Sequence, residues 1–209
     1  MPSGNRQFFD LSPNRPYVLE SGTELSAPQV AYETWGTLDA AASNAILVCH
    51  ALTGDAHAHG DAGPGQPTPG WWNDFIGSGK PLDTDRFFVV CANVLGGCQG
   101  STGPASINPS TGRRWGGDFP VVTIRDVVRS QRALGQYLGV QRWMAVVGGS
   151  MGGMQALEWA ASYPDRCGSL VIIASTAAAS AQQIAWSQVG RQAILDDPAY
   201  GQGNYYEAN

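Results

Sequence analysis

The sequence has little charge and little histidine. Asp, Glu, Lys and Arg make up 14% of its 209 residues, the formal net charge is −5, and the basic residues are scattered along the chain. Proteins that bind nucleic acid or anionic membranes usually carry a clustered basic patch. We therefore expect neither nucleic acid nor a membrane as a partner.

Cysteine and long apolar runs are also scarce. The four cysteines form no C-x-x-C pair, and three of them (Cys49, Cys91 and Cys167) lie in or beside apolar runs. Free cysteine behaves there as a small hydrophobic residue, so we expect no disulfide framework. The N-terminal residues lack the apolar core of a signal peptide, and no run is long enough to span a bilayer. These absences predict a cytoplasmic protein.

The sequence does contain alternating strand and helix patterns. Residues 28–36 alternate in polarity, and short apolar runs typical of buried strands occur at 45–50, 86–93, 143–149 and 169–175. Helical periodicity covers 123–139, with Thr123 and Asp126 as a capping box, and 151–164. The order predicts one α/β domain, a mostly parallel sheet with helices on both faces. The long Gly- and Pro-rich stretches 53–81 and 93–120 are predicted to be functional or irregular loops.

One short stretch suggests chemistry. In "VVGGSMGGMQALEWA" the pattern G-x-S-x-G is formed by Gly148, Ser150 and Gly152, between a predicted strand and a predicted helix. This is the arrangement of a nucleophile elbow, a tight turn whose neighbouring positions need glycine. The turn places the serine at a helix N-terminus, where the backbone N–H of Met151 can stabilise an oxyanion.

Two other interpretations of this stretch are open. Ser150 could merely cap the following helix. A dinucleotide-binding turn is the weaker alternative, because the G-x-G-x-x-G spacing and the acidic residue that closes a second strand are both missing.

A second oxyanion donor is expected from the loop after an earlier strand. The segment "LVCHALTGDAH" (47–57) leaves an apolar run with small residues, and an N–H near Leu52 could face the same oxyanion. His50 is interpreted as a structural histidine buried at the end of the strand, in preference to a proton-transfer role.

The histidines that follow invite a metal-site interpretation. Asp55, His57, His59 and Asp61 alternate in "DAHAHGD", and two histidines with a carboxylate can bind zinc or iron. The segment reads as a loop, however, and no second ligand cluster follows it. We therefore predict no metal.

Four ordered blocks together resemble a known family. "HALTGDAH", "NVLGGCQGSTGPASINPSTGR", "GGDFPVVTIRD" and "GGSMGGMQALEWA" are similar to the homoserine O-acyltransferases of the α/β-hydrolase superfamily, and the match runs from about residue 8 to residue 209. The resemblance implies an α/β-hydrolase-type fold and acyl transfer from acyl-CoA to the hydroxyl of L-homoserine. Ser150 would form the acyl-enzyme, and the N–H groups of Met151 and Leu52 would hold the oxyanion.

The same resemblance implies several further properties. The product would feed methionine biosynthesis in the cytoplasm, the enzyme would be a homodimer, and acyl-CoA would be a co-substrate rather than a bound cofactor. The acyl donor, acetyl-CoA or succinyl-CoA, stays open, as does homoserine or L-serine as acceptor.

The catalytic base is the point at which the sequence departs from the family. In α/β-hydrolases the nucleophile is followed by Asp or Glu and then by His. Here all three histidines, His50, His57 and His59, precede Ser150. The resemblance implies that the catalytic Asp and His, and a lid with a substrate-binding arginine, lie beyond the point that matches residue 209. We therefore expect residues 1–209 to be the N-terminal part of an acyltransferase domain, truncated before its lid and C-terminal part and inactive alone.

Two further functions remain as alternatives. An esterase of the same fold would transfer the acyl group to water through the same acyl-serine. A binding protein could retain the fold without catalysis. The elbow residues alone do not separate these possibilities from acyl transfer.

Overall fold

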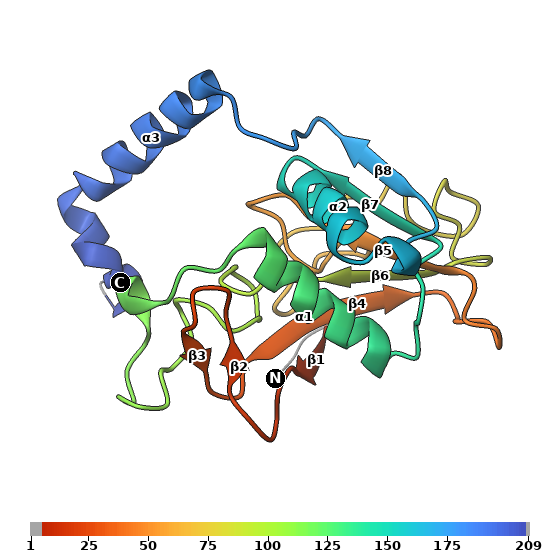
Figure 1. The fold of residues 1–209 in the computed structure, drawn as a ribbon, viewed down its shortest axis with the longest axis horizontal. Helices are drawn as coiled ribbons and strands as arrows, with labels where there is room; N and C mark the ends of the chain where they lie inside the picture. Colours follow the sequence, from red (N-terminus) through yellow and green to blue (C-terminus); the bar gives the residue numbers. More distant parts are fainter. Residues whose placement is uncertain (1–5, 208–209) are drawn as a thin grey trace.

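The computed structural model describes residues 6–207, and a six-stranded sheet lies at its centre (Figure 1). The strands stand in the order β1-β4-β6-β5-β7-β8. β6, β5, β7 and β8 are parallel, whereas β4 is antiparallel to β6 and β1 is antiparallel to β4. The strand bounds are Gln7–Asp10 (β1), Gln29–Trp35 (β4), Ala45–Cys49 (β5), Phe88–Ala92 (β6), Ala145–Gly149 (β7) and Leu170–Ile173 (β8). The predicted mostly parallel sheet is confirmed.

The remaining elements surround this sheet. A small hairpin-like pair is formed by β2 (Tyr17–Val18) and β3 (Glu24–Leu25). The α-helices are α1 (Ile124–Tyr137), α2 (Met151–Ser162) and α3 (Ala181–Leu195). Short 3₁₀ helices cover Gly116–Asp118, Pro164–Arg166, Pro198–Gly203 and Tyr205–Glu207. Among residues 6–207, no helix is both long and apolar enough to cross a membrane.

The centre of the sheet is buried on both faces. All five residues of β5 are buried, because β5 lies between β6 and β7 and its side chains alternate between two hydrophobic layers. This explains why residues 45–49 read as a continuous apolar run instead of an alternating one.

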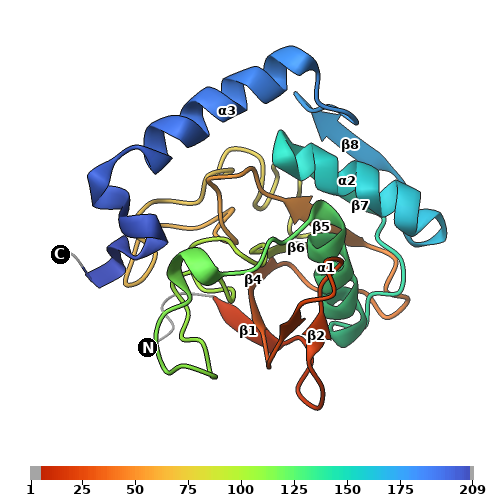
Figure 2. The same cartoon turned by 60° about the vertical axis from the view of Figure 1, so that its left-hand side comes forward.

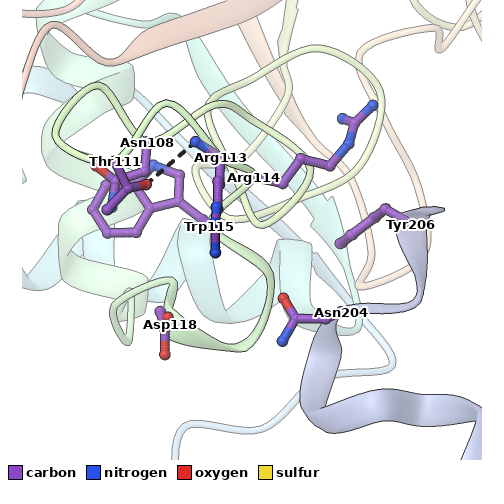
Figure 3. Close-up of a pocket in the computed structure, with 8 residues that line it drawn as sticks. All are labelled: Asn108, Thr111, Arg113, Arg114, Trp115, Asp118, Asn204 and Tyr206. Carbon is purple, nitrogen blue, oxygen red and sulfur yellow. Dashed lines mark hydrogen bonds between the residues drawn. The ribbon is translucent and has the colours of Figure 1, made fainter.

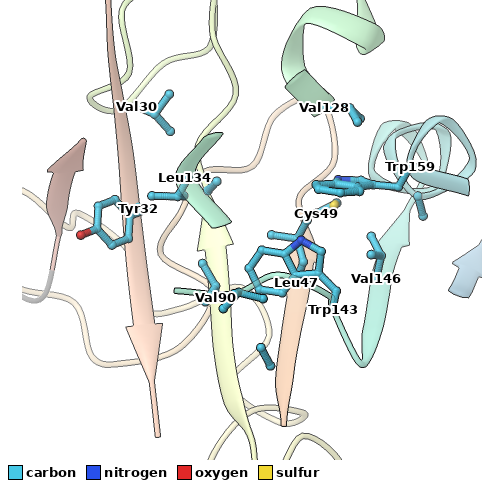
Figure 4. Close-up of a cluster of buried hydrophobic side chains, with 14 of the residues drawn as sticks. Val30, Tyr32, Leu47, Cys49, Val90, Val128, Leu134, Trp143, Val146 and Trp159 are labelled. Atoms are coloured by element: carbon cyan, nitrogen blue, oxygen red, sulfur yellow. The ribbon is translucent and has the colours of Figure 1, made fainter. Parts of the chain in front are cut away.

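Helices α1 and α2 cover one face of the sheet. Their side chains pack against the odd-numbered residues of β5, such as Leu47 and Cys49, in the larger hydrophobic core (Figure 4). Two tryptophans belong to this core. Trp143, which precedes β7, and Trp159 on α2 pack edge to face with 6.4 Å between their ring centroids. The predicted capping box of α1 is present between Thr123 and Asp126.

The opposite face is covered by irregular chain. Val48, Val89 and Cys91 pack there against Ala58 and Ile76, which belong to the long loop after β5. Figures 1 and 2 show α1 and α2 on the same side of the sheet. The sequence predicted helices on both faces; in the described part of the chain, a packed loop takes the place of helices on the second face.

Helix α3 stands apart from the sheet (Figures 1 and 2). None of its residues is buried, and apolar side chains such as Trp186 and Val189 are exposed over 70% and 62% of their surface. β8 is the edge strand of the described sheet, and its Val171, Ile172 and Ile173 are also exposed. This side of the molecule therefore presents an unusually apolar surface.

Candidate active site

Ser150 lies in the sharp turn between β7 and α2, at the carboxyl edge of the parallel strands. Its backbone adopts φ 55° and ψ −121°, a conformation that L-residues rarely adopt. The turn is held in place because the Ser150 N–H donates to the carbonyl of Ile173 on β8 (3.0 Å). The side chain is consequently exposed above the sheet.

The two flanking glycines leave no room for a side chain. A Cβ at Gly148 would lie 2.2 Å from the Gly152 carbonyl oxygen, and a Cβ at Gly152 would lie 2.0 Å from the Cys49 carbonyl oxygen. Neither glycine has a positive φ, so the reason for glycine is space rather than backbone freedom. The first turn of α2 thereby packs directly on the end of β5.

The helix-capping alternative for Ser150 is contradicted. Although Ser150 stands at the N-cap position of α2, its side chain accepts no hydrogen bond from the N–H groups of that helix. The hydroxyl is not used in holding the helix end.

The peptide that carries the Met151 N–H is fixed from its other side. The Ser150 carbonyl accepts hydrogen bonds from the Gly153 N–H (3.0 Å) and from the Ser175 hydroxyl (2.7 Å). In a trans peptide the C=O and the N–H point in opposite directions, so these contacts also set the direction of the Met151 N–H. Sequence analysis did not identify Ser175; its position just after a strand at the carboxyl edge of the sheet was the available signal.

The peptide that carries the Leu52 N–H is fixed in the same way. The His50 Nδ1 lies 2.7 Å from the Ala51 carbonyl oxygen, and the Gly54 N–H donates to that oxygen as well (3.0 Å). The Leu52 N–H therefore points away from the His50 ring, and the Leu52 side chain is 74% exposed.

His50 itself is completely buried, and both of its ring nitrogens are occupied. The Val94 N–H donates to Nε2 (3.1 Å), which requires the proton of the neutral ring to be on Nδ1. Burial lowers the pKa of His50 below its ordinary value and so favours this neutral form. These contacts favour the structural interpretation of His50.

A hollow of about 540 Å³ opens beside Leu52 and Met151. It extends along the loop after β6 and the segment that precedes α1. All its lining residues are uncharged: Leu52, Val94, Leu95, Gly96, Gly97, Cys98, Pro104, Gly116, Gly117, Phe119, Pro120, Val122, Thr123, Ile124, Val127, Met151 and Tyr200. Leu52 and Met151 line this hollow, whereas Ser150 is not among its lining residues.

A larger and more polar hollow of about 910 Å³ lies elsewhere (Figure 3). It is lined by Asn108, Thr111, Arg113, Arg114, Trp115, Asp118, Asn204 and Tyr206. Neither Ser150 nor the predicted oxyanion donors line it, so size alone does not identify the reactive site.

His57 is bonded to a buried carboxyl group. Its Nδ1 lies 2.9 Å from Oε2 of Glu33 on β4, and Gln66 donates to the other carboxylate oxygen. Burial raises the pKa of Glu33, which has no exposed surface. Glu33 was not predicted from the sequence, although a single carboxyl group in an otherwise buried strand was a signal that it has a polar partner.

The Asp55–Asp61 segment shows no metal-site geometry. No group of three potential ligands comes together among residues 6–207. The absence of a metal remains a prediction.

None of the three histidines is hydrogen-bonded to Ser150 in the described part of the chain. His50 is bonded through both ring nitrogens and His57 is paired with Glu33, while His59 contacts Trp35 edge to face. The roles predicted for Ser150, Leu52 and Met151 remain predictions, although their backbone geometry is compatible with them.

The sequence profile of a family described as alpha/beta hydrolase fold matches residues 44–209. Among curated proteins, the chain is 57% identical to the homoserine O-acetyltransferase of Thermobifida fusca over 206 residues, 99% of this chain and 54% of that protein. It is 56% identical to the homoserine O-succinyltransferase of Alkalilimnicola ehrlichii over 194 residues, 93% of this chain and 50% of that protein. The chain spans about half the length of the curated relatives it matches.

Solved structures of the same fold carry names of two different activities. Esterase E22 superimposes with a TM-score of 0.88 at 36% identity, over 97% of this chain and 56% of that one. The homoserine O-acetyltransferase from Bacillus anthracis gives 0.87 at 35% identity, over 97% of this chain and 55% of that one.

Proposed function

Because the chain belongs to the alpha/beta hydrolase fold family, we propose that it carries the nucleophile and oxyanion hole of a homoserine O-acyltransferase. The observation that carries this proposal is the exposed Ser150 at positive φ, together with the hydrogen bonds that fix the peptides carrying the Met151 and Leu52 N–H groups. The names of curated relatives at 56–57% identity supply the substrate class.

The proposed reaction has two halves. The hydroxyl oxygen of Ser150 attacks the thioester carbon of acyl-CoA, and the N–H groups of Met151 and Leu52 stabilise the negative oxygen that develops. The C–S bond breaks, and CoA leaves with the serine proton. The hydroxyl of L-homoserine then attacks the acyl-serine, which yields O-acylhomoserine and restores the Ser150 hydroxyl.

The base and acid of this reaction are proposed to lie outside residues 6–207. A general base must approach the serine hydroxyl within hydrogen-bonding distance, and none of the three histidines is hydrogen-bonded to Ser150 in the described part of the chain. We place the catalytic His and Asp, and a lid, in the half of the relatives' length that this chain does not span.

The surroundings favour acetyl as the acyl group. A succinyl group, unlike an acetyl group, would bring a free carboxylate, and burying a carboxylate without a cationic partner is costly. The hollow beside Leu52 and Met151 has no charged lining residue among those described. Acetyl-CoA as co-substrate, methionine biosynthesis in the cytoplasm and a homodimer complete the proposal.

A second candidate is ester hydrolysis, which the close likeness to esterase E22 favours. The two activities share the acyl-serine and differ in whether homoserine or water accepts the acyl group.

Thiol release and product formation in the intact protein test these alternatives. Acetyl-CoA and succinyl-CoA are each supplied with L-homoserine, with L-serine or with water alone. We expect fast thiol release only with acetyl-CoA and homoserine, together with O-acetylhomoserine. Equal release without homoserine would favour the hydrolase, and preference for succinyl-CoA would contradict the acetyl assignment.

A further inference from the structure

The two N–H groups of the proposed oxyanion hole belong to different elements. Leu52 follows β5, whereas Met151 is the first residue of α2. The hole can stabilise an oxyanion only if both donors lie at a fixed separation, within a few tenths of an ångström of the productive position. Something must therefore hold the end of β5 and the first turn of α2 in register.

One buried amide joins these two elements. The Nε2 of Gln155 on α2 lies 3.2 Å from the His50 carbonyl oxygen and 3.3 Å from the Met151 carbonyl oxygen. Gln155 has no exposed surface. Its single NH₂ group thus donates both to the residue that opens the oxyanion loop and to the residue that carries the second donor.

The orientation of the Gln155 amide is fixed by two further side chains. The indole N–H of Trp159 donates to Oε1 of Gln131 (2.8 Å), and Nε2 of Gln131 donates to Oε1 of Gln155 (2.7 Å). Because an indole nitrogen only donates, Gln131 must present its oxygen to Trp159 and its NH₂ to Gln155. Gln155 must then turn its own NH₂ toward His50 and Met151.

Packing of the hydrophobic core alone does not require the two buried amides of Gln131 and Gln155. Gln131 and Gln155 are 1% and 0% exposed, and a buried amide is tolerated only when its hydrogen bonds are made. An apolar side chain of similar length would fill the same space without partners.

We propose that Gln155 is a positioning residue that sets the separation of the Leu52 and Met151 N–H groups, with Gln131 and Trp159 fixing the direction of its amide. The proposal rests on the proposed function in one respect, the formation of an acyl-serine at Ser150. Gln155 acts through the backbone and does not touch the substrate.

The test measures acylation of Ser150 in the intact protein with p-nitrophenyl acetate, which needs no homoserine. Gln155→Met removes the hydrogen bonds to the His50 and Met151 carbonyl oxygens with little change in side-chain volume. We expect the rate constant of the acylation burst to fall roughly tenfold or more, below the 10²–10³-fold loss from removing a donor outright. The ester concentration that gives half of the maximal burst rate constant, which reports ground-state binding, should change less than about twofold, because ground-state contacts are untouched.

Two other variants separate positioning from stability. Gln131→Met keeps the Gln155 amide and removes the hydrogen bond that fixes its orientation. We therefore expect a smaller fall in the acylation rate constant than for Gln155→Met. Ser130→Ala, on α1, removes another buried hydrogen bond, to the Val127 carbonyl, which does not involve Leu52, Met151 or Gln155, and should leave the burst unchanged. The amount of acylated protein in each burst is normalised to the fraction of folded protein, which is measured by circular dichroism.

The outcomes are distinguishable. A folded Gln155→Met protein that acylates at the wild-type rate would overturn the positioning role, even if its melting temperature fell. If that variant does not fold, wild-type acylation by Gln131→Met would overturn it instead. A normal burst in the wild type without acyl transfer to homoserine would refute the proposed function while leaving the comparison of variants valid. Absence of any burst in the wild type would overturn both.

Discussion

At the scale of single residues, the turn around Ser150 depends on backbone positions that tolerate few substitutions. Ser150 keeps a positive φ, and the glycines on either side are required because a Cβ at Gly148 or Gly152 would lie 2.0–2.2 Å from a neighbouring carbonyl oxygen. Strain of this kind persists only where the surrounding structure enforces it. The contacts of β7, α2 and the end of β5 provide that enforcement.

Gly152→Ala is therefore expected to be destabilising. Its methyl group would meet the Cys49 carbonyl oxygen at 2.0 Å, so α2 must shift away from β5, at a cost of about 1–3 kcal/mol. Urea unfolding measures the change. Gly190→Ala in α3 is the matched control, because its Cβ would meet no atom within 4 Å and the substitution should not lower the free energy of global unfolding. Equal effects of the two substitutions would contradict the crowding argument.

His50 gives a prediction for pH. Burial lowers the pKa of His50 below 6.5, so below that pH the unfolded chain binds a proton that the folded chain does not. The contribution of His50 to stability is thus complete above pH 6.5 and is lost as the pH falls toward its lower folded pKa. Burial raises the pKa of Glu33 above 4.5, so its contribution is lost in the opposite direction, as the pH rises from 4.5 toward its folded pKa.

Unfolding of wild type and His50→Asn between about pH 7.5 and 5.5 tests this linkage. The variant retains a donor near the position of Nδ1 and loses the titration. We expect a shallower fall in its free energy of unfolding on acidification. Parallel curves for the two proteins would show that His50 is not held neutral.

At the scale of elements, the sequence predicted what local patterns encode. The run 45–50, the capping box at Thr123 and the strand–turn–helix around Ser150 were all found, because each depends on neighbouring residues. The local patterns did not reveal β1, which pairs with the later strand β4. They did not reveal α3 either, because the apolar residues of α3 do not lie on one face of the helix. The Glu33–His57 pair and the Gln155 contacts escaped for the same reason, since they join segments distant in sequence.

The two capping boxes offer a matched comparison. Thr123 caps α1, which contributes to the main core, whereas Ser180 caps α3, which buries no residue. Thr123→Ala should lower the free energy of global unfolding by about 1 kcal/mol. Ser180→Ala should affect helicity near α3 and leave the global transition unchanged. A larger global effect from Ser180→Ala would mean that α3 is more tightly coupled to the core than its exposure indicates.

At the scale of the whole molecule, two observations have a common explanation. The surface of α3 and β8 is apolar and exposed, and none of the three histidines is hydrogen-bonded to Ser150 in the described part of the chain. Both are explained if the part of the relatives' length that this chain does not span supplies a cover and a base. We expect residues 1–209 alone to show no acyl transfer above background, because the loss of a general base costs roughly 10²–10⁴-fold and triad members act together.

Complementation tests this expectation. The chain is co-expressed with the remaining part of the Thermobifida fusca relative, and thiol release from acetyl-CoA with homoserine is compared for the mixture and for each piece. Activity should appear in the mixture. Robust turnover by residues 1–209 alone would instead identify His50, His57 or His59 as the base.

The central claim is that Ser150 becomes acylated, and intact-mass spectrometry of the intact protein after rapid mixing with acetyl-CoA tests it most directly. We predict a mass increase of one acetyl group, located on the peptide that contains Ser150, and no increase in Ser150→Ala. An acetyl adduct that persists in Ser150→Ala, or that maps to another residue, would contradict the account.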